Sequence, residues 1–459
     1  MVGNHMLISA RWIWRSALIG SLLVALFSTY SPRESNAGAG RESQSWIGTW
    51  ATAPQPFLPR SIQTFRNQTL RLILHTSAGG TKVRIKISNT FGDKSLLIGS
   101  AHIAQRATAA DIDPSSDRVL KFHQRTSTTI SARSMVVSDP VDLDVPALSD
   151  LSISLFLPET TAATTSHILA LQTSYVSPET GDSTGAVKFP VAKAITSWPF
   201  LTGVDVLVSS RGASSRRASI VAFGSSTTDG DGSTKDANRR WPDVLAERLQ
   251  TSAGGDAGGF GVLGVLNEGI IGNRLLSDSS SPRQAGGPFG AVLDGFGAAL
   301  GPAGLARFDR DVLDQAGVRY VIVALGVNDI LFPGSFIPLT ESVSAQNLIS
   351  ANRQMIARAH KNGIRVIGTT TPPFEDATFN SPKISFYTAE KEAVRQEVNA
   401  WIRSSGEFDG VIDFDEVVRD PSHPARLLPQ YDSGDHLHVN DAGNVAQANA
   451  IPLVLFRGH

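Results

Sequence analysis

The spacing of apolar residues changes once along this 459-residue chain, and that change constrains the fold more than any other feature. From residue 46 to about residue 200, apolar and polar side chains alternate, as in the run VRIKI at residues 83–87. A period of two is typical of half-buried strands. Glycine-rich turn signals separate these runs, and no long helical pattern intervenes. We therefore predict an antiparallel β-sandwich domain over residues 46–208.

A polar, small-residue segment at 209–217 has the composition of a linker, and the pattern after it alternates between strands and helices. Residues 218–459 are thus predicted to form a parallel sheet flanked by helices, an α/β fold. We expect strands at 219–223, 262–266, 320–325 and 365–369, and helices at 238–250, 305–315, 344–360 and 389–404.

The N-terminus has the features of a targeting segment. Arg11 and Arg15 precede an apolar run at 17–27, and a small-x-small triplet follows at 35–37. This order predicts a signal peptide over residues 1–37 and export to the periplasm or the extracellular space. The alternative is a membrane anchor, but the apolar run is shorter than the ~20 residues that a spanning helix needs. Because the chain has no cysteine, an exported form would owe nothing to disulfides.

The charge balance excludes some partners. The formal net charge is −1 and the isoelectric point is about 6.8. Nucleic acid and anionic membrane surfaces are therefore not expected partners. The ten histidines are not spaced as metal ligands.

Four short motifs each supply one part of the machinery for acyl transfer. They are GSSTTDG at 224–230, GIIGN at 269–273, GVND at 326–329 and DHLH at 435–438. A serine hydroxyl needs an imidazole to take its proton, and the imidazole works best beside a carboxylate. The developing oxyanion needs donors that already point at it, such as glycine backbone or an asparagine amide. Three of the motifs follow predicted strands, where parallel sheets place their ligands.

At these four blocks the chain resembles the SGNH branch of the GDSL esterase/lipase family, in which the blocks occur in this order. The resemblance implies a flavodoxin-like parallel sheet with Ser226 as nucleophile, His438 as base and Asp435 as the residue that orients it. It implies oxyanion donors at Ser226 N–H, Gly272 N–H and the Asn328 side chain. It implies no metal or organic cofactor. The stretch 46–92 is similar to the β-rich domain that precedes the hydrolase domain in many secreted bacterial members.

The alignment with the family motifs has to choose between two adjacent serines and between two nearby histidines. Aligning GSSTTDG with the family pattern F-G-D-S-x-T-D-G places Ser226 at the nucleophile and Ser225 where the family has Asp. A base at His436 would put the orienting position at Ser433, which carries no charge. His438 is therefore the expected base. Val439 follows it where the family commonly has Pro.

Each motif also has a simpler explanation when taken alone. A serine after a strand is often a helix cap, a Gly-x-x-Gly segment is often a turn, and an isolated histidine is often structural. The ordered set of four favours catalysis over these explanations.

The sequence leaves several roles open. Three roles are open for the predicted sandwich: it binds glycan, it forms a wall of the active site, or it only supports the catalytic domain. Two roles are open for the Gly-, Ser- and Pro-rich segments 254–264 and 278–304. They form a lid or the rim of the substrate site, or they are disordered surface loops.

The expected function is that of a secreted serine ester hydrolase acting on short-chain or acetyl esters, those of carbohydrates included. No residue distinguishes a carbohydrate deacetylase from a short-chain carboxylesterase, and no extended apolar lid suggests a lipase. The alternative is a catalytically weak or inactive carbohydrate-binding protein on a hydrolase scaffold, for which Ser225 is the one argument. The expected partner is a small-molecule or carbohydrate ester, and the oligomeric state is not readable.

Overall fold

A computed structural model describes most of the chain after the N-terminal segment. The predicted signal peptide at 1–37 and the centre of the predicted linker, at 211–216, lie outside the described residues. Residues from Gly40 onward form one compact unit, so the boundaries between the expected domains stay a prediction. The described residues are 43–57, 62–210, 217–253, 261–279, 296–379 and 384–457.

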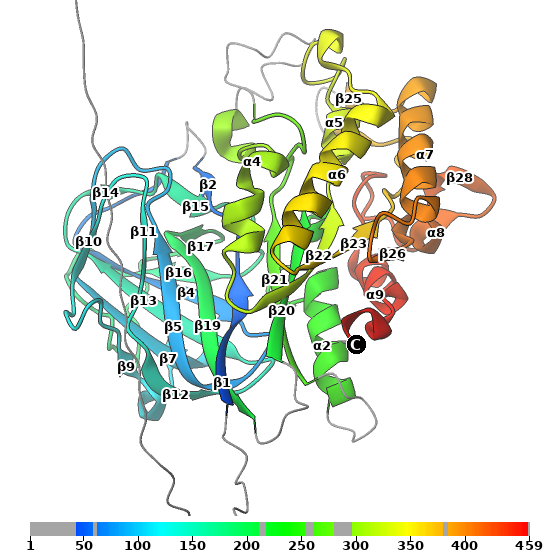
Figure 1. The fold of residues 1–459 in the computed structure, drawn as a ribbon. Helices are drawn as coiled ribbons and strands as arrows, with labels where there is room; N and C mark the ends of the chain where they lie inside the picture. The colour runs from blue at the N-terminus through cyan, green and yellow to red at the C-terminus, as the bar shows by residue number, and fades with distance from the viewer. Residues whose placement is uncertain are drawn as a thin grey trace, which may run out of the picture. The chain divides into compact units, whose positions relative to one another are not determined.

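The N-terminal half consists mainly of two antiparallel sheets (Figure 1). One sheet has the order β1-β19-β5-β11, and β12 also pairs with β5. The strands of this sheet are β1 (Ser43–Ala51), β19 (Leu201–Ser210), β5 (Gly80–Ser88), β11 (Met135–Val137) and β12 (Val141–Val145).

The second sheet has the order β17-β16-β4-β13-β7-β8, and β9 also pairs with β7. Alternating side chains from both sheets, such as Leu72, Ile85 and Ile153, are fully buried in one shared core. The predicted sandwich is therefore confirmed. The strands are β17 (Lys193–Ile195), β16 (Ser174–Val176), β4 (Gln68–His75), β13 (Asp150–Leu157), β7 (Ser100–Thr108), β8 (Asp111–Ile112) and β9 (Arg118–Val119).

Short strands complete this region. Two of the small sheets pair strands that lie far apart in the sequence, so they tie loops to the sandwich. The sets are β2 (Gln55–Pro56) with β15 (Thr165–His167) and β18 (Trp198–Pro199), β3 (Thr64–Phe65) with β14 (Thr161–Ala162), and β6 (Leu96–Ile98) with β10 (Thr128–Ile130).

The C-terminal half contains a parallel sheet with the order β21-β20-β22-β23-β26. In chain order this is 2-1-3-4-5, the arrangement of flavodoxin-like folds, and it places the carboxyl ends of the first three strands side by side. The predicted α/β sheet is confirmed. The strands are β20 (Arg217–Gly224), β21 (Val262–Gly269), β22 (Val318–Ala324), β23 (Arg365–Thr369) and β26 (Gly410–Ile412).

Helices cover both faces of this sheet (Figure 1). Val221 and Phe223 of β20 share a core with α6 (Ala345–Lys361) and α7 (Ala389–Ser404). The alternate residues Ile220 and Ala222 share another core with α2 (Trp241–Ala253) and α9 (Asp441–Ala450). Strands buried on both faces read as continuous apolar runs, as β20 does.

Shorter elements lie at the strand ends and in the connections. The helical ones are α1 (Ser226–Asp229), α4 (Gly304–Phe308), α5 (Val327–Leu331), α8 (Phe414–Val418), η2 (Gly297–Leu300), η3 (Asp309–Leu313), η4 (Leu339–Glu341), η5 (Leu453–Phe456) and, in the N-terminal half, η1 (Pro114–Ser116). The extended ones are β24 (Thr378–Phe379), β25 (Ile384–Ser385), β27 (Arg419–Asp420) and β28 (His423–Leu427). In the described part of the chain, no helix has the length and apolar character of a membrane span.

The helix expected at 344–360 is α6, shifted by one residue at each end, and two other helices differ more from the sequence expectation. The helix expected at 238–250 begins at Trp241, directly before Pro242, whose missing N–H suits a first helical turn. The single helix expected at 305–315 is wrong in detail, because it widens after Phe308 into a π-turn in which Asp314 N–H donates to Asp309 O at 3.0 Å.

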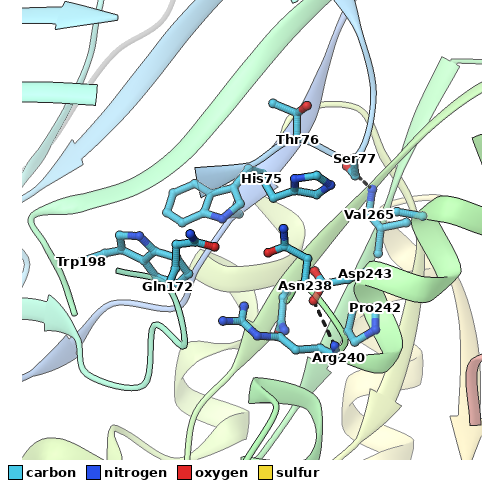
Figure 2. Close-up of a pocket in the computed structure, with 14 residues that line it drawn as sticks. His75, Thr76, Ser77, Gln172, Trp198, Asn238, Arg240, Pro242, Asp243 and Val265 are labelled. Atoms are coloured by element: carbon cyan, nitrogen blue, oxygen red, sulfur yellow. Dashed lines mark hydrogen bonds between the residues drawn. The ribbon is translucent and has the colours of Figure 1, made fainter. Parts of the chain in front are cut away.

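Hydrogen bonds join the β-rich region to the parallel sheet, one of them to β20 and one to β21. Ser77 Oγ accepts a hydrogen bond from Val265 N–H at 2.8 Å, as Figure 2 shows. At Gly264 a Cβ atom would lie only 1.9 Å from Gly48 O, so this contact requires glycine. A cavity of about 30 Å³ lies at this junction. Figure 2 shows residues that line it, among them His75, Gln172, Trp198, Asn238 and Arg240.

Candidate active site

Ser226 lies at a tight turn between β20 and α1. The strand ends at Gly224, and Asp229 N–H donates to Ser225 O at 2.9 Å to close the first turn of the helix. A Cβ atom on Gly224 would lie 2.1 Å from Thr228 Oγ1, so only glycine allows the helix to turn this closely onto the strand. The turn leaves the Ser226 side chain at the carboxyl end of the sheet, where it is 4% exposed.

A hydrogen-bonded chain joins Asp435, His438 and Ser226. Asp435 Oδ2 lies 2.6 Å from His438 Nδ1, and His438 Nε2 lies 2.8 Å from Ser226 Oγ. A carboxylate only accepts, so the proton of the neutral ring is on Nδ1. Nε2 is then free to accept the proton of the serine hydroxyl, which is the tautomer that a general base requires.

The loop that carries these residues holds the Asp435 carboxylate in place. Oδ1 accepts hydrogen bonds from Leu437 N–H at 2.9 Å and from His438 N–H at 2.8 Å. Burial raises the pKa of Asp435, but its hydrogen bonds to His438 outweigh burial and hold this pKa well below its usual range. Burial lowers the pKa of His438, but the bond to Asp435 and the charges of Asp231 and Asp435 outweigh burial, so this pKa is raised.

The register question has a geometric answer. His438 is the histidine that reaches Ser226, whereas His436 Nδ1 lies 2.5 Å from Asp432 Oδ2 and its side chain is 49% exposed. The partner of His436 is thus Asp432, not Ser433, and this second His–Asp pair has no hydrogen bond to Ser226 among the described residues.

Strand register brings the other two motifs to the same edge of the sheet. Gly224 pairs with Gly269 of β21 and with Ala324 of β22. Gly272 follows β21 with a φ of +68°, and a Cβ there would lie 2.9 Å from Leu300, so glycine is required twice over.

Asn328 lies on α5, and its Nδ2 donates to Asn273 O at 3.0 Å. This bond fixes the amide against the GIIGN segment and leaves its second N–H for another acceptor. Among the described residues, the N–H groups of Ser226 and Gly272 have no hydrogen-bond acceptor, and neither Gly272 nor Asn328 is bonded to Ser226 directly.

A buried arginine that the sequence did not single out ties these strand ends together. Arg307, on α4, is 1% exposed and donates to Gly224 O and Glu268 O, both at 2.9 Å. It also donates to Asn273 Oδ1 at 3.0 Å and to Asp311 Oδ2 at 2.9 Å. An arginine fork suits this task because it presents five donors in one plane.

Asp329, next to Asn328, anchors the segment that follows GIIGN. Its two carboxylate oxygens accept from Leu275 N–H at 2.6 Å and Leu276 N–H at 2.9 Å. Burial raises the pKa of Asp329 to about 6 despite these bonds.

Asp231 is a second acidic residue at the site that sequence reasoning missed. Its Oδ2 lies 3.7 Å from His438 Nε2, and its N–H donates to Ser226 O at 2.9 Å. The signal was present, since Asp231 directly follows the first motif, but spacing alone does not say that this side chain turns toward the histidine.

A small cavity opens beside Ser226. Its volume is about 30 Å³, and its wall is mostly apolar or formed by threonines. None of the described residues that line it belongs to the β-rich region. The lining residues are Ser225, Ser226, Thr227, Ala324, Leu325, Val327, Thr369, Thr370, Thr371, Pro372, Phe414 and Leu437.

The two long loops lie largely outside the described residues, at 254–260 and 280–295. The described end of the second loop includes η2, whose Leu300 lies against Gly272. Within the described chain, no group of three or more His, Asp or Glu side chains is placed to hold a metal ion.

Comparison with known proteins gives one family match. The model of the GDSL-like lipase/acylhydrolase family matches residues 220–451, which is the part of the chain that carries all four motifs. No curated protein matches the chain.

Three solved structures match about half of the length of this chain. A carbohydrate acetylesterase from Sinorhizobium meliloti is 14% identical with a TM-score of 0.35, and the match covers 51% of this chain and 96% of that one. The native aryl esterase of M. smegmatis is 15% identical with a TM-score of 0.35 and the same coverages, 51% and 96%. A GDSL-like lipase from Bacteroides thetaiotaomicron is 16% identical with a TM-score of 0.32, covering 52% and 87%. These values describe likeness and assign no substrate to the present chain.

Proposed function

This chain belongs to the GDSL-like lipase/acylhydrolase family, and we propose that it is an exported serine ester hydrolase that works through an acyl-enzyme. The observation that carries the proposal is the chain from Asp435 through His438 to Ser226, with contacts of 2.6 and 2.8 Å. Nucleophile, base and orienting carboxylate within hydrogen-bonding reach are the signature of an activated serine.

The reaction begins when Ser226 Oγ attacks the ester carbonyl carbon while His438 Nε2 takes the hydroxyl proton. Asp435 keeps the ring in the required tautomer and stabilises the imidazolium. The tetrahedral intermediate then expels the alcohol, which receives the proton from His438. Water attacks the acyl-enzyme in the same way, so that the acid leaves and Ser226 recovers its proton.

The oxyanion is proposed to bind between Ser226 N–H, Gly272 N–H and the free N–H of the Asn328 amide. The register of β20, β21 and β22 supports this set, because it brings the three motifs to one edge. The two backbone donors have no acceptor among the described residues, as groups that wait for a developing charge should.

A short acyl group is the proposed substrate component. The cavity beside Ser226 holds about 30 Å³, room for on the order of two water-sized groups, which suits a methyl or ethyl group and not a long chain. Acetyl esters, those of carbohydrates included, are therefore the first class to test. Export is proposed from the N-terminal pattern of residues 1–37.

The proposal is tested with p-nitrophenyl esters from acetate to long acyl chains and with acetate release from acetylated xylan. We expect hydrolysis of the shortest esters and its loss in Ser226→Ala. Ser225→Ala serves as the register control, and its rate is expected to fall less than about tenfold, against about 10³-fold or more for a lost nucleophile. Activity in Ser226→Ala equal to that of the wild type would refute the assignment. Glycan binding with no turnover of any ester would favour the binding-protein alternative.

A further inference from the structure

We propose that His167, a residue of the β-rich region, is a positioning residue for the oxyanion block of the hydrolase. It binds the Asp229 carboxylate, which in turn binds the backbone one residue before Gly272. The inference rests on the proposed function, because it assigns His167 a part in placing one of the proposed oxyanion donors.

His167 is the last residue of β15 and is 2% exposed. Its Nδ1 lies 3.0 Å from Ala53 O, and its Nε2 lies 2.9 Å from Asp229 Oδ1. The ring also lies beside Trp198, with 5.7 Å between ring centroids and 31° between planes. Both ring nitrogens are thus engaged, and these two contacts fix the orientation of the ring.

The two contacts determine where protons must be. A backbone carbonyl only accepts, so Nδ1 carries a hydrogen that it donates to Ala53 O. The contact between Nε2 and Asp229 Oδ1 then needs one further proton, held by the ring or by the carboxyl group. Either arrangement makes the buried His–Asp pair neutral overall, which avoids an uncompensated charge between two side chains that are each 2% exposed.

Asp229 contacts both the segment before Gly272 and the turn that carries Ser226. Its Oδ2 accepts from Ile271 N–H at 2.8 Å, and its own N–H donates to Ser225 O at 2.9 Å. A Cβ on Gly269 would lie 2.3 Å from Asp229 N, so α1 rests directly on the end of β21. One carboxylate therefore holds the segment before Gly272 against the helix that begins with Ser226.

The physical consequence is specific to the transition state. A donor to an oxyanion must lie within about 2.7–3.1 Å of a charge that exists only during reaction. Loosening Ile271 displaces the Gly272 N–H from that position while it leaves the binding of the neutral ester largely as it was. The expected effect is on kcat and not on KM. This gives the β-rich region a role in catalysis without contact with substrate.

The hydrogen-bonded path from His167 through Asp229 to Ile271 can be interrupted at either of its two side chains. His167→Phe keeps a ring beside Trp198 but removes the bond to Asp229. Asp229→Ala removes the anchor of Ile271, and His167 can then be a neutral imidazole that keeps its bond to Ala53 O. We expect each variant to lower kcat for p-nitrophenyl acetate about 10- to 100-fold and to change KM less than about threefold. This decrease in kcat is no larger than the decrease caused by removing one oxyanion donor. All rates are compared below the melting temperature of every variant.

Two further variants separate positioning from general damage. The Asn of Asp229→Asn can accept from Ile271 N–H and donate to a neutral His167 Nε2, so it should retain kcat within a few-fold of the wild type and should fold. His102→Ala removes another His–Asp pair of the β-rich region, with contacts of 3.0 Å to Asp117, and should leave kcat unchanged.

The outcomes distinguish this inference from the proposed function. No turnover by the wild type would refute the proposed function itself. An active wild type with folded His167→Phe and Asp229→Ala variants of normal kcat would overturn the positioning role alone. A loss in Asp229→Asn as large as in Asp229→Ala would also overturn it, because the hydrogen-bonded path would then not be the cause.

Discussion

The Asp231 carboxylate lies 3.7 Å from Nε2 of His438, the same nitrogen that faces Ser226 Oγ. The imidazole of the site is therefore placed between two carboxylates, since Asp435 contacts its other nitrogen at 2.6 Å. Both charges stabilise the imidazolium and raise the pKa of His438. A base with a raised pKa is a stronger proton acceptor, but it is occupied by a proton over a wider pH range.

Replacing Asp231 by Asn should move the acid limb of the rate profile to lower pH. Only neutral His438 can act as base, so the rate falls as pH drops through its pKa, which the Asp231 charge raises. Without that charge the pKa of His438 falls. At a pH just below the acid limb of the wild type, the variant should therefore be a few-fold more active than the wild type. The profile of kcat/KM for p-nitrophenyl acetate measures this. A limb that stays in place, or moves upward, would contradict the assignment.

Asp435→Asn should lower kcat by about 10²- to 10⁴-fold. An Asn amide would donate to His438 Nδ1 and so force the proton onto Nε2, where the ring can no longer accept from Ser226. The matched control is Asp432→Asn, because Asp432 pairs with His436 and not with His438. Initial rates of both variants, with circular dichroism to verify folding, measure the difference. Equal losses in the two would argue against Asp435 as the orienting residue.

The cavity beside Ser226 predicts a change in acyl preference. Val327 lines this cavity, and Val327→Ala removes two methyl groups from its wall. We expect the ratio of kcat/KM for butyrate over acetate to rise by about 10-fold or more, because one methylene in an apolar pocket is worth about 1–3 kcal/mol. A ratio equal to that of the wild type would mean that the acyl group binds elsewhere.

Arg307→Met should destabilise the hydrolase half of the chain. The substitution removes one buried donor from the carbonyls of Gly224 and Glu268 and from Asn273 Oδ1. Gly224 O keeps a hydrogen bond from Ile270 N–H at 3.2 Å. Removing one partner from such a buried charged network costs about 3–5 kcal/mol in the free energy of unfolding. Urea titration measures it. Arg353→Met, which removes the half-exposed pair with Glu407, should change stability far less. A similar change in both variants would contradict the role given to Arg307.

Elements with a long, regular pattern were predictable from the sequence. The helix expected at 389–404 is α7 with the same bounds, and the strand expected at 365–369 is β23. The three-residue strand β26 and the helix α9 were not anticipated. Three residues are too few to establish a period, and α9 is rich in small and polar residues, so its buried face carries little apolar signal.

The residues of the site likewise fall into those that the sequence predicted and those that it did not. Ser226, His438 and Asp435 were expected from their motifs, and the structure places them in one hydrogen-bonded chain. His167 and Arg307 were not expected, because their importance arises from tertiary contacts with backbone and side chains far away in the sequence. His167 lies 62 positions before Asp229, in a region whose strand pattern says nothing of catalysis.

If Ser226 is the nucleophile of an acyl-transfer reaction, a reagent that labels activated serines should modify it. The protein is treated with a fluorophosphonate, which phosphonylates activated serines, and the modified peptide is identified by mass spectrometry. We predict one stoichiometric adduct on Ser226, its absence in Ser226→Ala, and slower labelling in Asp435→Asn. An unmodified wild-type protein, or an adduct on Ser225 in its place, would show that Ser226 is not the activated nucleophile.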